Sequence, residues 1–222
     1  MNVLITGSTG MVGKSVLNEC INDDRIKNIF LINRSPVNLK SYKISEFILD
    51  NFLNVYELKN KISNCDACFH CMGITSFGQN ADYYYKVTYE MTKALVDLVY
   101  LINPNSVVIY VSGEGTNSKQ NGKIRWSNVK GKTENYILNK GFKDAYMIRL
   151  GLLIPENGIV AKTKLYNLFY TLLIPFYPLM KIIPSITTST KLGQAMINCL
   201  YFKSENKYLS NQEINSLSSK NK

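Results

Sequence analysis

The feature that most constrains the fold is a glycine-rich turn near the N-terminus. The apolar run Asn2–Thr6 predicts a β-strand, and apolar positions in Val12–Asn22 recur with helical spacing. Three glycines, each three residues after the last, separate the two segments. The first permits a tight turn, the second lets backbone N–H groups approach a pyrophosphate, and the third lets the helix pack closely on the strand. The turn therefore predicts a dinucleotide site formed by Gly7, Ser8, Thr9, Gly10, Met11, Val12 and Gly13.

The same segment admits a second interpretation, as the phosphate-binding loop of a nucleotide hydrolase. Residues 8–15 read Ser-Thr-Gly-Met-Val-Gly-Lys-Ser, with Ser8 where such a loop has its first glycine. In that case Lys14 and Ser15 would hold phosphate and magnesium. We favour the dinucleotide interpretation, because no apolar strand ending in Asp stands out as the metal-binding partner.

Apolar strands alternate with helical segments along the chain. Strands are expected at Asn2–Thr6, Ile29–Asn33, Glu46–Asp50, Ala67–Gly73, Ser106–Ser112 and Ala145–Leu150, and helices at Val12–Asn22, Tyr85–Leu101 and Trp126–Asn139. Helices of this length between strands imply right-handed crossovers and a parallel sheet covered on both faces. The sequence thus predicts an α/β fold with a Rossmann-type doubly wound parallel sheet, whose ligands bind at the carboxyl ends of the strands.

The organisation expected from this pattern is one structural unit with a small addition. Residues 1–155 form the NAD(P)-binding domain, and residues 156–215 form a helical, apolar lobe on the substrate side, with a helix near Lys191–Tyr201 and a short strand at Lys207–Leu209. The polar residues 216–222 are expected to be a flexible tail.

The ends of the second and third strands indicate which dinucleotide is bound. Arg34 follows the second strand, where an acidic residue would accept hydrogen bonds from a ribose 2′-hydroxyl. A guanidinium there can pair with a 2′-phosphate, so NADP is favoured over NAD, against the alternative of a solvated loop arginine. Asp50 could hydrogen-bond the adenine amino group or cap the following turn.

Charge and cysteine content narrow the class of protein further. The net charge is +10, but the cations are mostly dispersed lysines with only four arginines, so specific nucleic-acid binding is not expected.

No signal peptide opens the sequence, which favours a cytoplasmic protein with reduced thiols. Cys65, Cys68 and Cys71 surround the only histidine, His70, yet on a buried strand Cys68 and Cys71 would point to opposite faces. We therefore expect core cysteines and no metal site.

Several of these motifs together resemble the short-chain dehydrogenase/reductase superfamily, most closely its extended and atypical members of the NAD-dependent epimerase/dehydratase type. They are Thr-Gly-x-x-Gly-x-x-Gly at the first turn, Asp50, Cys71-Met72-Gly73 after the fourth strand, Val111-Ser112-Gly113 after the fifth, and Val129-Lys130-Gly131-Lys132-Thr133-Glu134 on a helix. The resemblance spans nearly the whole chain and is strongest before Gly151.

The resemblance implies a role for particular residues. Ser112 would orient the reacting oxygen of the substrate, and Lys130 would bind the nicotinamide ribose. The family's catalytic tyrosine lies four residues before this lysine, where the present chain has Trp126. Indole has no usable acid, so Trp126 cannot donate or remove the proton, and we expect it to wall the nicotinamide pocket instead.

The resemblance also implies further contacts to the cofactor and to a partner. Met72 and Gly73 would contact the cofactor, as would the backbone of Gly151 and Leu152, although Leu150 stands where the family usually has proline. A homodimer through the helices after the fourth and fifth strands is a family expectation.

Residues 165–184 form an apolar stretch that the motifs do not explain. A spanning helix is disfavoured because Pro175 and Pro178 interrupt the stretch. One interpretation is a lobe that covers the pocket and buries its aromatic side chains. The alternative is a peripheral membrane patch. In it, Leu168, Phe169, Leu172 and Phe176 would enter the bilayer, and Lys162, Lys164 and Lys181 would meet anionic head groups.

Three functional hypotheses remain open at this stage. The first is an NAD(P)-dependent oxidoreductase or epimerase acting on a small or hydrophobic carbonyl or hydroxyl substrate. The second, favoured by Trp126, is a non-catalytic NADP-binding regulator or assembly factor. The third is a P-loop-like nucleotide binder. Whether the protein is an enzyme is left undecided by the sequence.

Overall fold

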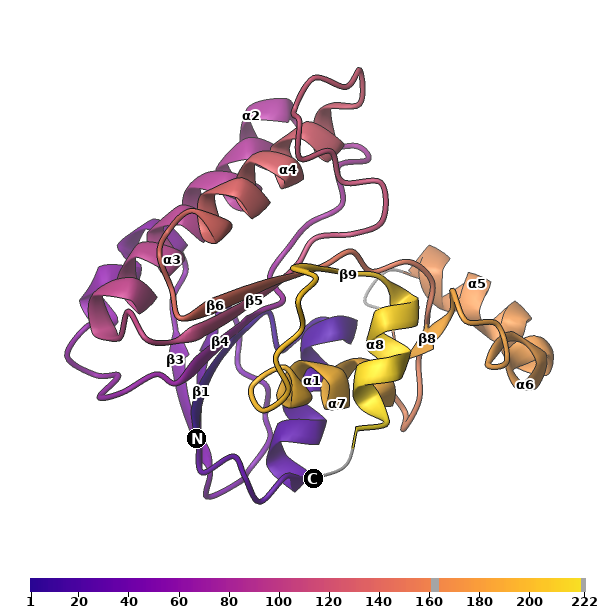
Figure 1. Cartoon of the computed structure of the whole chain (residues 1–222), viewed down its shortest axis with the longest axis horizontal. Helices are drawn as coiled ribbons and strands as arrows, with labels where there is room; N and C mark the ends of the chain where they lie inside the picture. The colour runs from indigo at the N-terminus through magenta and orange to yellow at the C-terminus, as the bar shows by residue number, and fades with distance from the viewer. Residues whose placement is uncertain (161–163, 221–222) are drawn as a thin grey trace.

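A seven-stranded parallel sheet forms the centre of the computed structural model, which describes residues 1–160 and 164–220 (Figure 1). Its strands are β1 (Asn2–Thr6), β2 (Asn28–Asn33), β3 (Ile44–Ile48), β4 (Ala67–His70), β5 (Val107–Val111), β6 (Asp144–Ile148) and β9 (Tyr208–Leu209). They lie in the order β3-β2-β1-β4-β5-β6-β9. The direction of winding reverses between β1 and β4, which is where ligands bind in such sheets. The Rossmann-type doubly wound fold expected from the sequence is confirmed.

Helices cover both faces of the sheet (Figure 1). One face carries α1 (Met11–Asn22), α7 (Ser189–Asn198) and α8 (Asn211–Ser218); the other carries the 3₁₀ segment η1 (Phe52–Leu58), α3 (Met91–Ile102) and α4 (Arg125–Leu138). Alternate strand residues point to opposite faces, so Val3 and Ile5 join the first core and Leu4 joins the second. The strands are buried on both faces, and this explains why they read as continuous apolar runs.

Several element boundaries differ from those expected. The third strand begins two residues earlier, and the fourth ends at His70, so residues 71–73 belong to a loop. The expected helix from Tyr85 is three segments, α2 (Ala81–Tyr85), a π-helical turn η2 (Lys86–Glu90) and α3. Asn80 starts α2, because its side chain accepts hydrogen bonds from two backbone N–H groups.

Four of the five cysteines are buried in the two cores as expected, and Cys71 is partly buried. Cys65 and Cys68 are fully buried in the core beside α3, whereas Cys71 packs against the opposite core. The expectation that Cys68 and Cys71 point apart is therefore confirmed.

The C-terminal residues depart from expectation in two respects. The chain does not become a flexible tail at Ser216, because α8 continues to Ser218, with Leu217 buried in the core. Asn198 also donates hydrogen bonds to the carbonyl oxygens of Leu217 and Lys220, each at 2.9 Å. The second departure concerns residues 164–183. Their short elements α5 (Lys164–Leu173), η3 (Ile174–Phe176) and α6 (Tyr177–Met180) project from the body of the molecule (Figure 1).

The projecting segment does not bury its apolar side chains as one sequence interpretation expected. Leu168, Leu172 and Phe176 are all more than half exposed. Two short parallel strands, β7 (Leu153–Ile154) and β8 (Thr187–Thr188), join its two ends to the body. None of the helices in the described ranges is long and apolar enough to cross a bilayer.

Candidate functional site

The glycine turn is held in a space that admits no side chain at two of its positions. Gly7 has a φ of +71°, and a Cβ atom there would lie 2.7 Å from the backbone of Cys71 and Met72. A Cβ atom on Gly13 would lie 2.2 Å from the carbonyl oxygen of Gly7. The turn closes with a hydrogen bond of 2.9 Å from the Gly10 N–H to the Gly7 oxygen. The N-terminus of α1 is thus pressed against the carboxyl ends of β1 and β4.

A pocket of about 440 Å³ opens at this position, at the reversal point of the sheet. Its lining residues are Gly7, Thr9, Gly10, Asn33, Arg34, Ser35, Phe52, Cys71, Met72, Gly73, Ile74, Thr75 and Gln79. The structure therefore brings together six residues singled out from the sequence, namely Gly7, Thr9, Gly10, Arg34, Met72 and Gly73. The remaining lining residues flank them in the chain or come from the start of η1.

The other members of the predicted dinucleotide site lie outside the lining. Ser8 is buried beneath the turn, and Met11 and Val12 pack against the core. Asp50 lies exposed in the loop after β3, two residues before Phe52, which does line the pocket. Its contact to adenine stays a prediction.

The loop that carries Arg34 is anchored by residues that sequence reasoning missed. The Ser8 hydroxyl and the buried Asn33 amide are hydrogen-bonded to each other at 2.8 and 3.0 Å. Asn33 also donates to the Glu46 carboxylate at 2.8 Å, and this carboxylate accepts the Val37 N–H at 3.1 Å. These bonds fix the start of the loop and leave Arg34 exposed at the pocket. The sequence did contain a signal for this anchor, because the polar residue Asn33 ends a strand that is otherwise apolar from Ile29 onward.

Lys130 lies on α4 and reaches the carboxyl end of β5. Its ammonium donates a hydrogen bond to the carbonyl oxygen of Ser112. A Cβ atom on Gly113 would lie 3.7 Å from the Lys130 Nζ. Burial lowers the pKa of Lys130 to about 8, against an opposing effect of the Glu134 carboxylate. Lys130 is thus a cation at neutral pH that sits beside the loop after β5.

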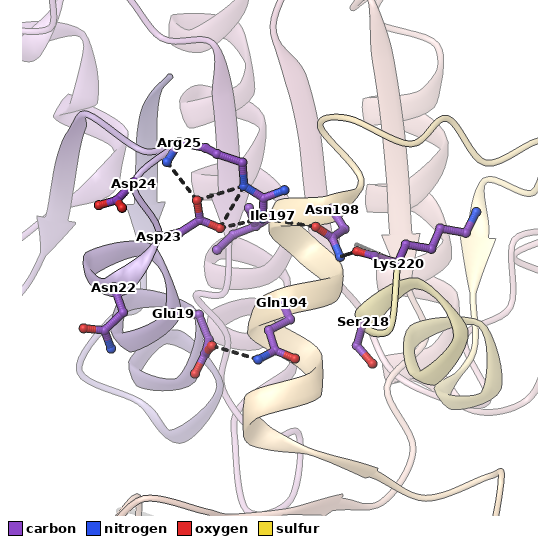
Figure 2. Close-up of a pocket in the computed structure, with 10 residues that line it drawn as sticks. All are labelled: Glu19, Asn22, Asp23, Asp24, Arg25, Gln194, Ile197, Asn198, Ser218 and Lys220. Atoms are coloured by element: carbon purple, nitrogen blue, oxygen red, sulfur yellow. Dashed lines mark hydrogen bonds and ion pairs between the residues drawn. The ribbon is translucent and has the colours of Figure 1, made fainter. Parts of the chain in front are cut away.

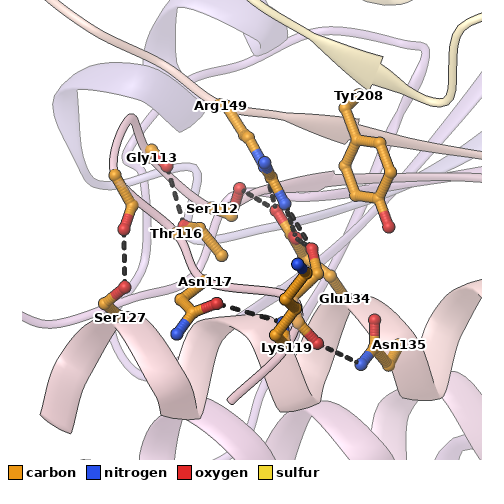
Figure 3. A network of polar contacts seen from close by, with 12 residues as sticks. Ser112, Gly113, Thr116, Asn117, Lys119, Ser127, Glu134, Asn135, Arg149 and Tyr208 are labelled. Carbon is orange, nitrogen blue, oxygen red and sulfur yellow. Dashed lines mark hydrogen bonds and ion pairs between the residues drawn. The ribbon is translucent and has the colours of Figure 1, made fainter. Parts of the chain in front are cut away.

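The hydroxyl of Ser112 is already engaged. It donates a 2.7 Å hydrogen bond to the fully buried carboxylate of Glu134, and Figure 3 shows Arg149 approaching the same carboxylate. The Arg149–Glu134 ion pair measures 2.7 Å, and Ser118 adds a further hydrogen bond to Glu134. The guanidinium also lies 4.2 Å from the centre of the Tyr208 ring. The network ties β5, α4 and β6 together, so Ser112 would have to leave Glu134 before it could orient a substrate.

Trp126 lies at the start of α4, half-buried against the loop after β5. A Cβ atom on Gly115 would lie 3.4 Å from its indole ring. Gly115 itself lines a second pocket of about 430 Å³ at the ends of β5, β6 and β9. Trp126 thus supports one wall of that pocket from behind, while its expected contact to nicotinamide stays a prediction.

The second pocket is lined mostly by residues with polar side chains. It is lined by Glu114, Gly115, Arg149, Gly151, Ser185, Ser210, Asn211 and Gln212. Here the buried Asn211 was missed by sequence reasoning. Its side chain accepts a hydrogen bond from the Gly151 N–H at 3.1 Å and donates to the Leu152 oxygen at 2.9 Å. In the backbone expected to contact the cofactor, the Gly151 N–H and the Leu152 carbonyl oxygen are therefore already hydrogen-bonded to the Asn211 side chain.

His70 is buried in a hydrogen-bonded position at the end of β4. Its ring nitrogens share hydrogen bonds with the hydroxyls of Thr6 at 2.6 Å and Thr92 at 2.9 Å, and its ring stacks on Tyr110. Burial, together with the nearby Lys130 ammonium, lowers the pKa of His70 to about 3. The imidazole is therefore neutral and links β1, β4 and α3.

The alternative phosphate-binding loop is not supported by the placement of its two key residues. Lys14 is exposed on α1, and the Ser15 hydroxyl is buried and donates to the Met11 carbonyl at 2.8 Å. A hydroxyl turned into its own helix is not available to a metal ion. Among the described residues no group of three or more His, Cys, Asp or Glu side chains could hold a metal.

A further pocket of about 560 Å³ lies at the opposite end of the sheet, between α1, α7 and the end of α8 (Figure 2). Asp23 and Arg25 form a 2.5 Å ion pair in it, and the Arg25 guanidinium also donates to Asn198. None of the predicted site residues in the described chain lines this pocket.

Comparison with known proteins agrees with the fold. The model of the NAD dependent epimerase/dehydratase family matches residues 3–149. No curated protein matches the chain in sequence.

Solved structures share the fold at low sequence identity. UDP-glucose 4-epimerase from Thermotoga maritima, solved with UDP-glucose, is 12% identical to this chain, with a TM-score of 0.70. The alignment covers 98% of this chain and 81% of the epimerase chain. The enzyme WbmH of Bordetella bronchiseptica, solved with NAD⁺, is 12% identical, with a TM-score of 0.67. The alignment covers 94% of this chain and 75% of WbmH. A short-chain dehydrogenase/reductase from Saccharomyces cerevisiae is 16% identical, with a TM-score of 0.69. The alignment covers 94% of this chain and 95% of the yeast chain.

Proposed function

We propose, from the premise that the chain belongs to the NAD dependent epimerase/dehydratase family, that it binds a nicotinamide dinucleotide with the pyrophosphate on the turn from Gly7 to Gly13. One observation supports this proposal above the others. The turn that excludes side chains at Gly7 and Gly13 opens onto a pocket of about 440 Å³ at the reversal point of the sheet. Backbone N–H groups at a helix N-terminus suit a pyrophosphate, so the residues present fit the cofactor.

NADP is the proposed dinucleotide, in preference to NAD. The exposed Arg34 lines the pocket after β2, where a guanidinium can form paired hydrogen bonds with a 2′-phosphate. The carboxylate of Glu46, on the neighbouring strand β3, already accepts hydrogen bonds from Asn33 and Val37.

The proposed reaction is an oxidation, reduction or epimerisation of a carbonyl or hydroxyl group. When bound, the dinucleotide would supply the carbon that accepts or donates hydride. Lys130 would bind the nicotinamide ribose, and Glu114 and Arg149 in the second pocket favour a small polar substrate. Since Trp126 cannot transfer a proton, water or the substrate itself would supply it.

A non-catalytic NADP-binding regulator is the second candidate, and specific observations favour it. The Ser112 hydroxyl is held by Glu134, and Asn211 already bonds the Gly151 N–H and the Leu152 carbonyl oxygen. The chain would then keep the cofactor site and lack a free group to polarise a substrate.

Calorimetric titration with NADPH and with NADH tests the binding proposal. The expected result is saturable binding that is tighter for NADPH. Arg34→Ala should weaken NADPH binding about tenfold or more, as expected for a charge-assisted contact, and leave NADH binding unchanged. Arg125→Ala, which removes an exposed arginine outside the pocket, is the matched control. Absence of binding by both dinucleotides would overturn the proposal.

Turnover then separates the two candidates. Purified protein with NADPH or NADP is assayed against panels of small hydroxyl and carbonyl compounds, following nicotinamide absorbance. Turnover that is lost in Lys130→Met identifies an oxidoreductase. Tight binding without turnover supports the regulator.

A further inference from the structure

The projecting segment between β7 and β8 exposes apolar surface at a density found nowhere else in the described chain. Of the eighteen large apolar side chains that are exposed among the described residues, eight lie between Val160 and Ile183. Leu172 and Leu179 are each 67% exposed, and Ile182 is 76% exposed. Elsewhere such residues occur singly or in pairs along the sequence, which is ordinary for a protein surface. A concentration of this kind marks an interaction surface.

The charge of the same region has one sign. From Asn157 to Ile183 the sequence contains three lysines, Lys162, Lys164 and Lys181, and neither aspartate nor glutamate, although the whole chain has 16 acidic residues. Lys181 pairs at 2.5 Å with Glu156, immediately before this stretch, and so fastens the base of the projection. Lys162 lies outside the described residues, and the side chains of Lys164 and Phe169 are likewise not described. An apolar surface within an acid-free, lysine-bearing region is complementary to an anionic, partly apolar one.

The shape of the segment suits a surface contact and not a transmembrane span. Its longest helix, α5, has ten residues, and Pro175 and Pro178 introduce separate short turns after it. Leu168 and Leu172 lie four residues apart and so share one face of α5. Paired strands β7 and β8 hold both ends of the segment to the body.

We propose that the surface formed by Leu168, Leu172, Ile174, Phe176, Leu179 and Ile182 docks the protein onto an anionic lipid bilayer. The apolar side chains enter the boundary between head groups and acyl chains, and the chain's net charge of +10 adds electrostatic attraction to an anionic surface. A second copy of this chain fits less well, because a symmetric contact through this surface brings two acid-free, positively charged regions together.

Vesicle flotation without added dinucleotide tests the proposal. The full chain is mixed with vesicles of phosphatidylcholine alone or of phosphatidylcholine with one quarter phosphatidylglycerol, in 0.1 M and 0.5 M salt. We expect binding to the anionic vesicles that is at least fivefold weaker in high salt and on the neutral vesicles. The double variant Leu172→Glu with Leu179→Glu should lose at least nine-tenths of this binding.

A matched control carries the same change in charge elsewhere. The double variant Leu39→Glu with Leu101→Glu alters two exposed leucines outside the segment and should float like the parent. Both variants change exposed side chains, so both should keep the parent's circular dichroism and NADPH affinity. Flotation needs no dinucleotide, so a failure of the proposed cofactor site leaves this test intact.

Three outcomes would overturn the proposal. One is absence of flotation with anionic vesicles. Another is equal flotation of the Leu172/Leu179 variant and the parent. The third is a lipid-free dimer, seen by analytical ultracentrifugation, that the same variant dissociates, since the surface would then be covered by a second copy.

Discussion

At the scale of single residues, the carboxyl edge of the sheet is dominated by charged groups whose environment sets their behaviour. Lys130 and Glu134 lie one helical turn apart on α4, yet they are used differently. The ammonium donates a hydrogen bond to the backbone carbonyl of Ser112, just after β5, whereas the carboxylate is buried and accepts hydrogen bonds from Ser112 and Arg149. The sequence indicated the lysine through a family motif. It gave no sign of the carboxylate's role, because a glutamate on a helix is ordinarily solvated.

The lowered pKa of Lys130 predicts a pH-dependent affinity for the dinucleotide. Above a pKa of about 8 the ammonium loses its charge, so a contact to the nicotinamide ribose weakens as the pH rises. NADPH affinity should fall about tenfold between pH 7 and pH 9.5, the loss of one charge-assisted hydrogen bond. Calorimetry over this range measures it. Lys130→Arg stays charged throughout, and its affinity should be flat; a parallel fall in both proteins would contradict the assignment.

Removing the charge of Glu134 should destabilise the protein. Glu134→Gln leaves the Arg149 guanidinium without its buried partner, and breaking a buried pair in this way costs about 3 kcal/mol in the free energy of unfolding. Urea denaturation measures the loss. The comparison is Lys93→Met, which removes a more exposed partner of Asp97 and should cost less than about 1 kcal/mol. Equal losses would mean that Glu134 is not buried as described.

At the scale of elements, periodicity found most segments, and tertiary contacts decided where they end. Apolar runs identified β1, β2 and β5 to within a residue, because strands buried on both faces leave a continuous signal. The π-helical turn η2 was missed, since its residues are as compatible with an α-helix. The helix α8 was missed because its sequence is polar apart from Ile214 and Leu217, whose side chains enter the core.

Because α1 packs closely on the glycine turn, we expect that adding one methyl group at Gly13 lowers both stability and NADPH affinity. Gly13→Ala places a Cβ atom in contact with the Gly7 backbone, so α1 must move away from β1. We expect a loss of about 1–3 kcal/mol in the free energy of unfolding and at least a tenfold loss of NADPH affinity. Gly73→Ala meets no atom within 4 Å and should leave stability within about 0.5 kcal/mol of the parent. Thermal unfolding and calorimetry compare the two variants, and tolerance of alanine at Gly13 would contradict the close approach.

At the scale of the whole molecule, a single histidine governs stability in mildly acidic solution. His70 is the only histidine in the chain, and its pKa is lowered to about 3 in the folded state. Above about pH 6.5 it is neutral in both states, whereas below that value only the unfolded chain takes up the proton. The contribution of His70 to the free energy of unfolding should therefore fall as the pH drops from 6.5, with a slope that approaches about 1.4 kcal/mol per pH unit by pH 5.

Two measurements check this expectation. Urea denaturation at pH 7.5 and 5.0 should show the fall in the parent and a smaller one in His70→Gln. Proton NMR of the imidazole should show no titration between pH 8 and 5. A midpoint near 6.5 would mean that water reaches the ring.

The sequence by itself determined the parallel sheet, the glycine turn and the family, because each depends on local patterns of apolar residues and glycines. It also placed Arg34, Met72 and Gly73 at strand ends, and the topology brings these ends to one pocket. Only the tertiary structure decided which polar groups are free. Glu134 accepts a hydrogen bond from the Ser112 hydroxyl, and Asn211 bonds the Gly151 N–H and the Leu152 carbonyl oxygen. The apolar side chains of the segment around Leu172 stay exposed. The physical reason is that hydrogen-bond partners and burial arise between residues far apart in the chain, so local patterns carry no record of them.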